Sequence, residues 1–532
     1  MAKLIEIFDS TLRDGAQGEG IAFSAIDKIN IVKVLDNIGV AYIEAGNPGS
    51  NPKDLEFFEL IKKTKLKTSK LCAFGSTRRC NITVQEDANV MNLLTADTPV
   101  VAIFGKCWDL HVHKVIKTTL EENLAMIKET VAFFKEKGKE VVFDAEHFFD
   151  GCKANEEYAF EALNAASEGG ADVICLCDTN GAAYPNEVFD LTQKVVQRFG
   201  KRVAIHCHND TGLATANSMF SVDAGATQVQ GTFVGFGERC GNANLSTIIP
   251  NLQIKRGFEC IPEKKLSLLC SVARTIAEIA NLQLPNSLPY VGSSAFAHKG
   301  GMHIDGVSKI SSSFEHINPD VVGNERRFLM SEVSGRTTIL AAINKIDPTL
   351  TKDSPEAKDV INRIKELEHF GYQFEAAQSS VELLIRKVLG SYKPFFELEQ
   401  YKIVGEQPSS NPENCAMAMI KVIVDGKTEI TAAQGDGPVH ALDTAMKKAL
   451  VTFYPVLANV HLTDYKVRVM EPGAAAAAKV RVLIESSDGE HVWSNVGVST
   501  DIIEASWIAL VDSIEYKLTR DFECRLGKIW NS

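Results

Sequence analysis

The chain has 532 residues, of which 45% are hydrophobic and 23% charged, as in a folded protein with a large core. Its net charge of −12 argues against nucleic-acid binding, and no apolar run reaches the ~18 residues that a membrane span needs. The first residues do not resemble a signal peptide, and the 12 cysteines lack paired CxxC spacing. We therefore expect a cytoplasmic protein with reduced thiols and no membrane or nucleic-acid partner.

The first part of the chain alternates between short apolar runs and amphipathic stretches. The runs are apolar on both faces, as parallel strands covered by helices must be. They lie at residues 4–8, 41–45, 70–74, 100–104, 140–145, 172–176, 202–208 and 227–232. Helices are predicted between them, for example over 24–39, 155–169 and 183–200, each ending at a glycine. Eight strands at this spacing predict a TIM (β/α)8 barrel over residues 1–260.

The strand pattern fades after the barrel. Over residues 261–394 helical patterns are interrupted by Pro, Gly and Ser, which predicts an α-helical linker and lid region. Residues 395–532 contain a weak internal repeat, in which YKIV at Tyr401 recurs as YKVRV at Tyr465. Each half predicts strands followed by a helix, so we expect a C-terminal α+β pseudo-twofold domain that pairs with itself. Its role is regulatory or, as the alternative, dimerisation alone.

Polar residues follow nearly every predicted strand, at the end of a TIM barrel where active sites lie. The N-terminal strand ends show no comparable set. The candidate site residues within the barrel are Arg13, Asp14, Glu146, Thr179, His206, His208 and Asn242.

Two of these residues predict a metal site. His206 and His208 are two positions apart on a strand, so both side chains point to the same face. With Asp14 they form a His-His-carboxylate set, to which Asn242 adds a fourth oxygen. Nitrogen and hard oxygen ligands suit a divalent ion: we expect Mg²⁺ or Mn²⁺, with Zn²⁺ or Co²⁺ as alternatives. An isolated HxH is more often structural, so the assignment depends on the other strand-end residues.

Three further residues are candidates for substrate chemistry. Arg13 would stabilise charge on a substrate oxygen, and a salt bridge within the barrel is the alternative. Glu146 would orient a base or the substrate, and a buried pair with an arginine is the alternative. Thr179 would bind a substrate carboxylate, unless it caps the next helix. The glycine-rich run at 235–242 follows the last strand, so it is predicted to shape the barrel mouth rather than to bind a dinucleotide.

Several motifs are shared with a known family. DSTLRDG (9–15), HCHND (206–210) and GERCGN (237–242) together resemble the DRE-type TIM-barrel metallolyases. The helical region and the repeated C-terminal domain narrow the resemblance to the 2-isopropylmalate and citramalate synthases. Finer segments, FGKCWDLHV (104–112) and DAEHFFDG (144–151) among them, are similar to the (R)-citramalate synthase branch.

The resemblance implies an activity. It is a Claisen-type condensation of acetyl-CoA with pyruvate and water, giving (R)-citramalate and CoA in isoleucine biosynthesis. This is an acyltransferase reaction in which the acyl group becomes an alkyl group. The resemblance also implies a homodimer with end-product feedback through the C-terminal domain, with isoleucine as the expected effector and leucine as the alternative.

A catalytic base is implied as well. In related synthases a histidine removes the acetyl methyl proton, and its segment is similar to GMHIDG (301–306), which points to His303. His298 is the alternative. Related synthases carry a tyrosine where this chain has Phe314, so no tyrosine role is assigned.

Three other functions compete with this hypothesis. A 2-isopropylmalate synthase, acting on 3-methyl-2-oxobutanoate, would share these residues and differ only in its keto-acid pocket. An acyl-CoA lyase would lack the lid and the regulatory domain. An amino-acid-sensing scaffold with an inactive barrel is disfavoured because Arg13, Asp14 and both histidines are intact.

Overall fold

The computed structural model describes residues 3–49, 51–200, 202–329, 336–351, 353–405, 416–470, 478–489 and 491–525. The chain divides into two compact units. The first comprises residues up to Phe296 together with Ile317–Glu325, and the second comprises Ala297–His316 and the residues from Arg326 onward.

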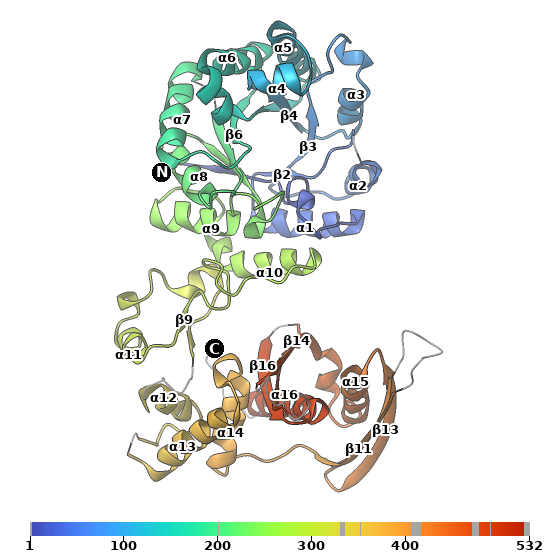
Figure 1. Cartoon of the computed structure of the whole chain (residues 1–532), viewed down its shortest axis with the longest axis vertical. Helices are drawn as coiled ribbons and strands as arrows, with labels where there is room; N and C mark the ends of the chain where they lie inside the picture. The colour runs from blue at the N-terminus through green and yellow to red at the C-terminus, as the bar shows by residue number, and fades with distance from the viewer. Residues whose placement is uncertain are drawn as a thin grey trace. The chain divides into compact units, whose positions relative to one another are not determined.

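Eight parallel strands of the first unit close into a barrel, with β1 paired to both β2 and β8 (Figure 1). The strands are β1 (Glu6–Asp9), β2 (Tyr42–Glu44), β3 (Lys70–Ser76), β4 (Val100–Lys106), β5 (Glu140–Glu146), β6 (Val173–Asp178), β7 (Arg202–Cys207) and β8 (Gln228–Gly231). The predicted TIM barrel is confirmed.

Helices surround these strands, with the last of them lying outside the others (Figure 1). They are α1 (Ala25–Ile38), α2 (Pro52–Ile61), α3 (Ala88–Thr95), α4 (Asp109–Lys114), α5 (Leu120–Glu136), α6 (Phe148–Gly169), α7 (Pro185–Phe199), α8 (Ala214–Asp223), α9 (Leu245–Pro250) and α10 (Leu269–Ile279). Helix α1 shows why the predicted limits hold. Ser24 and Asp27 form a capping box at its start, and Gly39 adopts a left-handed φ of 96° at its end.

Helix α6 differs from its prediction. It begins at Phe148, seven residues before the predicted start, and Asn155 has non-helical dihedral angles of −156° and 83°. The residues before Asn155 form a short helical segment that is separated from the rest of α6 by a kink, and its Phe148 and Phe149 pack into the core. The amphipathic pattern of the sequence begins only after this break. The sequence therefore predicted the second part of the helix and missed the first part.

The expectation that the N-terminal strand ends show no comparable set of polar residues is wrong. Arg202 pairs with Glu6 and, at 2.8 Å, with Glu140, while the Tyr42 hydroxyl donates to Glu140 at 2.8 Å. These side chains satisfy one another, and an apolar layer that includes Phe8 lies further inside the barrel. The charges at this end therefore form a closed network, whereas those at the other end form the candidate site.

The second unit begins with α11 (Gly301–Lys309), the two short strands β9 (Ala297–His298) and β10 (Arg327–Phe328), and the helices α12 (Arg336–Ile346), α13 (Pro355–Phe370) and α14 (Gln378–Val388). Helices α12 to α14 share a hydrophobic core that also contains Val496 and Val498 from the C-terminal repeat. The linker helices are therefore packed against that repeat rather than lying apart from it.

The repeat has the predicted architecture. Its first half is β11 (Glu397–Gly405), β12 (Ala416–Val424), β13 (Lys427–Gly435) and α15 (Pro438–Leu450), and its second half is β14 (His461–Val469), β15 (Val480–Ser487), β16 (Val492–Ser499) and α16 (Ile502–Arg525). Each half has a three-stranded antiparallel sheet followed by a helix. Of the helices described, none combines the length and the apolar character that a bilayer span requires.

Candidate metal centre and active site

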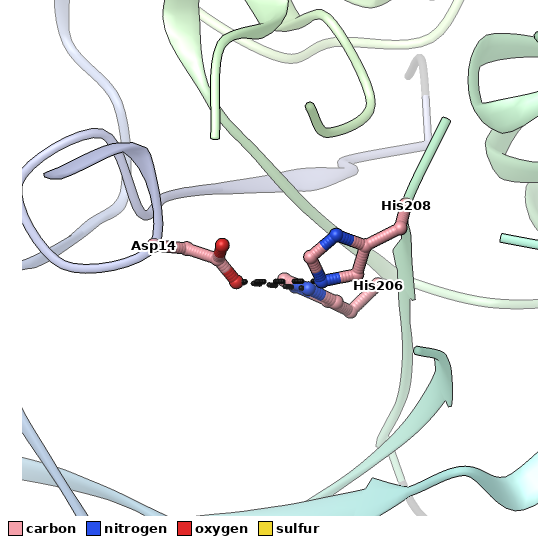
Figure 2. Close-up of side chains that lie close together, drawn as sticks. All are labelled: Asp14, His206 and His208. Carbon is pink, nitrogen blue, oxygen red and sulfur yellow. Dashed lines mark ion pairs between the residues drawn. The ribbon is translucent and has the colours of Figure 1, made fainter. Parts of the chain in front are cut away.

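Three of the predicted side chains meet at the C-terminal end of the barrel (Figure 2). Nε2 of His206 lies 3.3 Å, and Nε2 of His208 3.7 Å, from Oδ2 of Asp14. His206 lies on β7, His208 follows it directly, and Asp14 lies in the loop after β1. All three residues are buried. The two-residue spacing at the end of β7 places the imidazoles side by side, and the closed barrel brings the carboxylate of Asp14 next to them.

This geometry fits a divalent ion. Ligand atoms held about 2.0–2.2 Å from one ion lie roughly 3.0–3.5 Å from one another, close to the separations seen here. The donor atoms of the three residues all lie within 4.8 Å of one another. Two nitrogens and one carboxylate leave open positions for substrate oxygens, unlike the four-cysteine set of a structural zinc site.

Asn242 lies beside this set, as predicted. Its amide nitrogen donates to Oδ1 of Asp14 at 3.1 Å, while its Oδ1 is buried without a partner among the described residues. Gly237 makes this approach possible, because a Cβ there would lie 2.2 Å from the Asn242 amide nitrogen. The Asn242 oxygen is thus available as a further ligand. The close approach of Asn242 also explains why the first position of GERCGN is a glycine.

The electrostatics of Asp14 and His208 suit metal binding, whereas at His206 burial lowers the pKa but the Asp14 carboxylate raises it by more. Burial favours the neutral carboxyl of Asp14, but the Arg13 guanidinium and the His206 hydrogen bond outweigh it, so the pKa of Asp14 falls well below its usual range. Burial and the charge of His206 lower the pKa of His208 to about 4. Asp14 is therefore anionic and His208 neutral near pH 7, the forms that bind metal ions.

Arg13 is held by three partners. Its Nε donates to Glu44 at 2.6 Å, its Nη1 donates to Asp14 at 3.1 Å, and its guanidinium carbon lies 3.8 Å from the Phe74 ring centre. Ser10 donates its hydroxyl to the same Glu44 oxygen at 2.5 Å. Glu44 was not among the predicted site residues. Nothing in the sequence around this short strand indicates that its glutamate pairs with an arginine 31 positions away.

The remaining barrel candidates have different neighbours. Glu146 pairs with Lys106 rather than with an arginine, and this pair stands at the adjacent ends of β4 and β5. The Thr179 hydroxyl accepts a hydrogen bond from the backbone N–H of His147 at 2.9 Å. Accepting this bond leaves the hydroxyl hydrogen for another acceptor, such as a carboxylate.

The two lid histidines lie in the second unit and differ in exposure. His303 is exposed on α11 and stacks on Phe314, with ring centres 4.3 Å apart. His298 is buried, and its Nε2 lies 3.1 Å from Glu315, which also pairs with Arg326. Of these two, His303 has the accessible ring.

A second cluster beneath the site consists of Asp144, Cys175 and Cys177. Burial raises the pKa of Cys175 well above its usual value, and Gln230 donates to Asp144 at 3.1 Å. Protonated thiols are poor metal ligands, and both cysteines belong to the apolar barrel interior. Packing accounts for this group.

Comparison with known proteins divides the chain into three matched regions. Residues 4–276 match the HMGL-like family, residues 290–371 the "homocitrate synthase post-HMGL domain-like" family, and residues 375–518 the "LeuA allosteric (dimerisation) domain". The fold and the three matches define the class: an HMGL-like barrel with a post-barrel domain and a LeuA-type domain.

Full-length relatives narrow the class. The chain is 52% identical to an (R)-citramalate synthase of Aquifex aeolicus, over 98% of this chain and 99% of the relative. It is 47% identical to that of Geobacter sulfurreducens over 99% of both, and 30% identical to a probable 2-isopropylmalate synthase of Methanopyrus kandleri over 97% of this chain and 98% of the relative. The chain belongs to the (R)-citramalate synthase family.

Proposed function

We propose that the chain condenses acetyl-CoA with pyruvate and water to form (R)-citramalate and CoA. The observation that carries this proposal is the 52% identity to an (R)-citramalate synthase over nearly the whole of both chains. Asp14, His206 and His208 form a buried candidate metal site with Arg13 beside it, which supports a catalytically active barrel.

Each side chain then has a task. A divalent ion held by Asp14, His206, His208 and Asn242 would supply Lewis-acid polarisation of the keto acid. Arg13, fixed by Glu44, donates toward the ketone oxygen as negative charge develops there.

Substrate binding and proton transfer fall to four other residues. Thr179 donates its hydroxyl hydrogen to the keto-acid carboxylate, and Glu146 with Lys106 orients the substrate. His303 accepts the proton from the acetyl methyl group.

The substrate assay tests this proposal. CoA thiol release from acetyl-CoA is compared across pyruvate, 2-oxobutanoate and 3-methyl-2-oxobutanoate, with the divalent ion varied. Pyruvate is expected to give the highest kcat/KM, and preference for the branched acid would instead make the chain a 2-isopropylmalate synthase. Adding isoleucine or leucine to the same assay identifies the effector, for which isoleucine is expected.

We extend the proposal to the organisation of the protein. Residues 1–260 form the catalytic barrel, 261–394 the linker and lid, and 395–532 the regulatory and dimerisation domain of a cytoplasmic homodimer. The LeuA-type match over 375–518 supports a regulatory role for the last part. Mg²⁺ or Mn²⁺ is the proposed ion, since hard oxygen ligands accompany the two imidazoles.

Arg13→Lys is expected to lower kcat by about 10²–10³-fold with little change in the KM for acetyl-CoA. Loss of one oxyanion donor costs about 3–4 kcal/mol, and lysine keeps the charge but not the planar fork that bridges Glu44 and Asp14. Steady-state kinetics measure the effect, with Arg198→Lys on the exposed face of α7 as the control. A change confined to KM would make Arg13 a structural residue.

A further inference from the structure

A cluster of aromatic and histidine side chains at the C-terminal ends of β4 and β5 has no part in the chemistry described above. The His111 ring centre lies 5.1 Å from that of Trp108, with the two rings nearly parallel, and 4.3 Å from that of His147. Nδ1 of His111 is buried and has no partner among the described residues. Trp108 and His111 follow β4, and His147 follows β5. The ends of these two strands carry the Lys106–Glu146 pair, so the cluster borders the candidate active site.

The backbone at His147 is unusual. It has a φ of 56° and a ψ of 35°, a left-handed conformation that non-glycine residues rarely adopt and that is enriched at functional sites. Its N–H donates to the Thr179 hydroxyl at 2.9 Å. This conformation turns the chain sharply between β5 and α6 and holds His147 next to a residue that we propose binds the substrate.

The side chain of His147 is oriented by a carboxylate. Its Nδ1 lies 3.2 Å from Oδ2 of Asp150, and the Asn180 amide donates to that same oxygen at 2.9 Å. A carboxylate can only accept from Nδ1–H, so the neutral ring carries its hydrogen on Nδ1 and its lone pair on Nε2. A histidine held in this way is arranged to take a proton through Nε2.

The proposed reaction needs a second base. It has two chemical steps, carbon–carbon bond formation and hydrolysis of the resulting hydroxyacyl thioester. The metal ligands, Arg13 and His303 serve the first step. The second step consumes water, and none of the residues assigned above activates it.

We propose that His147, oriented by Asp150, is the general base for thioester hydrolysis; this inference rests on the proposed function. Nε2 takes a proton from water as the water oxygen bonds to the thioester carbonyl carbon. The carbon–sulfur bond then breaks, and the imidazolium returns the proton to the departing CoA thiolate. Asp150 acts as a positioning residue that sets the tautomer.

The test separates the two steps in a single-turnover reaction of acetyl-CoA with pyruvate, quenched in acid and resolved by mass spectrometry. His147→Asn is chosen because asparagine tolerates left-handed backbone. We expect it to form the hydroxyacyl-CoA adduct at near wild-type rate and to release CoA at least 100-fold more slowly. His113→Asn, an exposed histidine on α4, should leave both steps unchanged.

Asp150→Asn is the second variant. Its amide would donate to Nδ1 and move the ring hydrogen to Nε2, so the same accumulation of adduct is expected from an isosteric change. If His147→Asn does not fold, Asp150→Asn decides the question alone. CoA release at the wild-type rate, or loss of both steps with metal content intact, overturns the inference. A wild-type protein that releases no CoA with any keto acid would instead refute the proposed function.

Discussion

Replacing His206 by alanine is expected to abolish turnover and to remove most of the bound divalent ion. His206 lies at the centre of the site, with its Nε2 3.3 Å from Asp14 and its ring centre 5.2 Å from that of His208. Its loss leaves one imidazole and one carboxylate, and it also removes a hydrogen bond that helps keep Asp14 anionic. Activity and metal content, the latter by mass spectrometry, check the result in the same samples.

His113→Ala is the matched control for this variant, because His113 is an exposed histidine on the barrel that has no role in the site. It should retain full metal content and activity. If His206→Ala keeps both, the metal site lies elsewhere. If it loses activity but keeps the ion, His206 acts on the substrate rather than on the metal.

His303→Ala is expected to stop condensation while leaving metal and keto-acid binding intact. The accessible ring of His303 lies on α11, and no predicted metal ligand belongs to that unit. A base that is carried on a lid can admit substrates and then exclude water until the carbon–carbon bond forms. The measurement is solvent-deuterium exchange into the acetyl methyl group, where the wild type shows it, together with the rate of adduct formation.

His298→Ala serves as the comparison for His303. His298 is buried against Glu315, so its replacement should reduce thermal stability more than the intrinsic rate of condensation. Condensation by His303→Ala at near the wild-type rate would exclude His303 as the base and would favour His298 or Glu146. A decrease in metal content in His303→Ala would also contradict the assignment.

Local patterns in the sequence were sufficient to predict the barrel and the three side chains that meet in the candidate metal site. Apolar runs repeat because every barrel strand is buried on both faces, and the HxH spacing places His206 and His208 on one face because strand side chains alternate. Active sites of TIM barrels lie at the C-terminal strand ends, and this rule predicted that Asp14, which follows the first strand, lies near the two histidines. The internal repeat likewise predicted two sheets with one helix each.

Only the tertiary structure showed which residues complete these elements. Glu44 holds Arg13 across 31 residues, and Gly237 makes room for Asn242. Glu140 pairs with Arg202 at the end of the barrel where no comparable set of polar residues was expected. His147 has its orienting carboxylate only three residues away, but its backbone N–H donates to Thr179, which follows the next strand. The contacts of Arg13 with Glu44 and of Glu140 with Arg202 join side chains from different strands of the barrel, and no periodic pattern in the chain encodes such contacts.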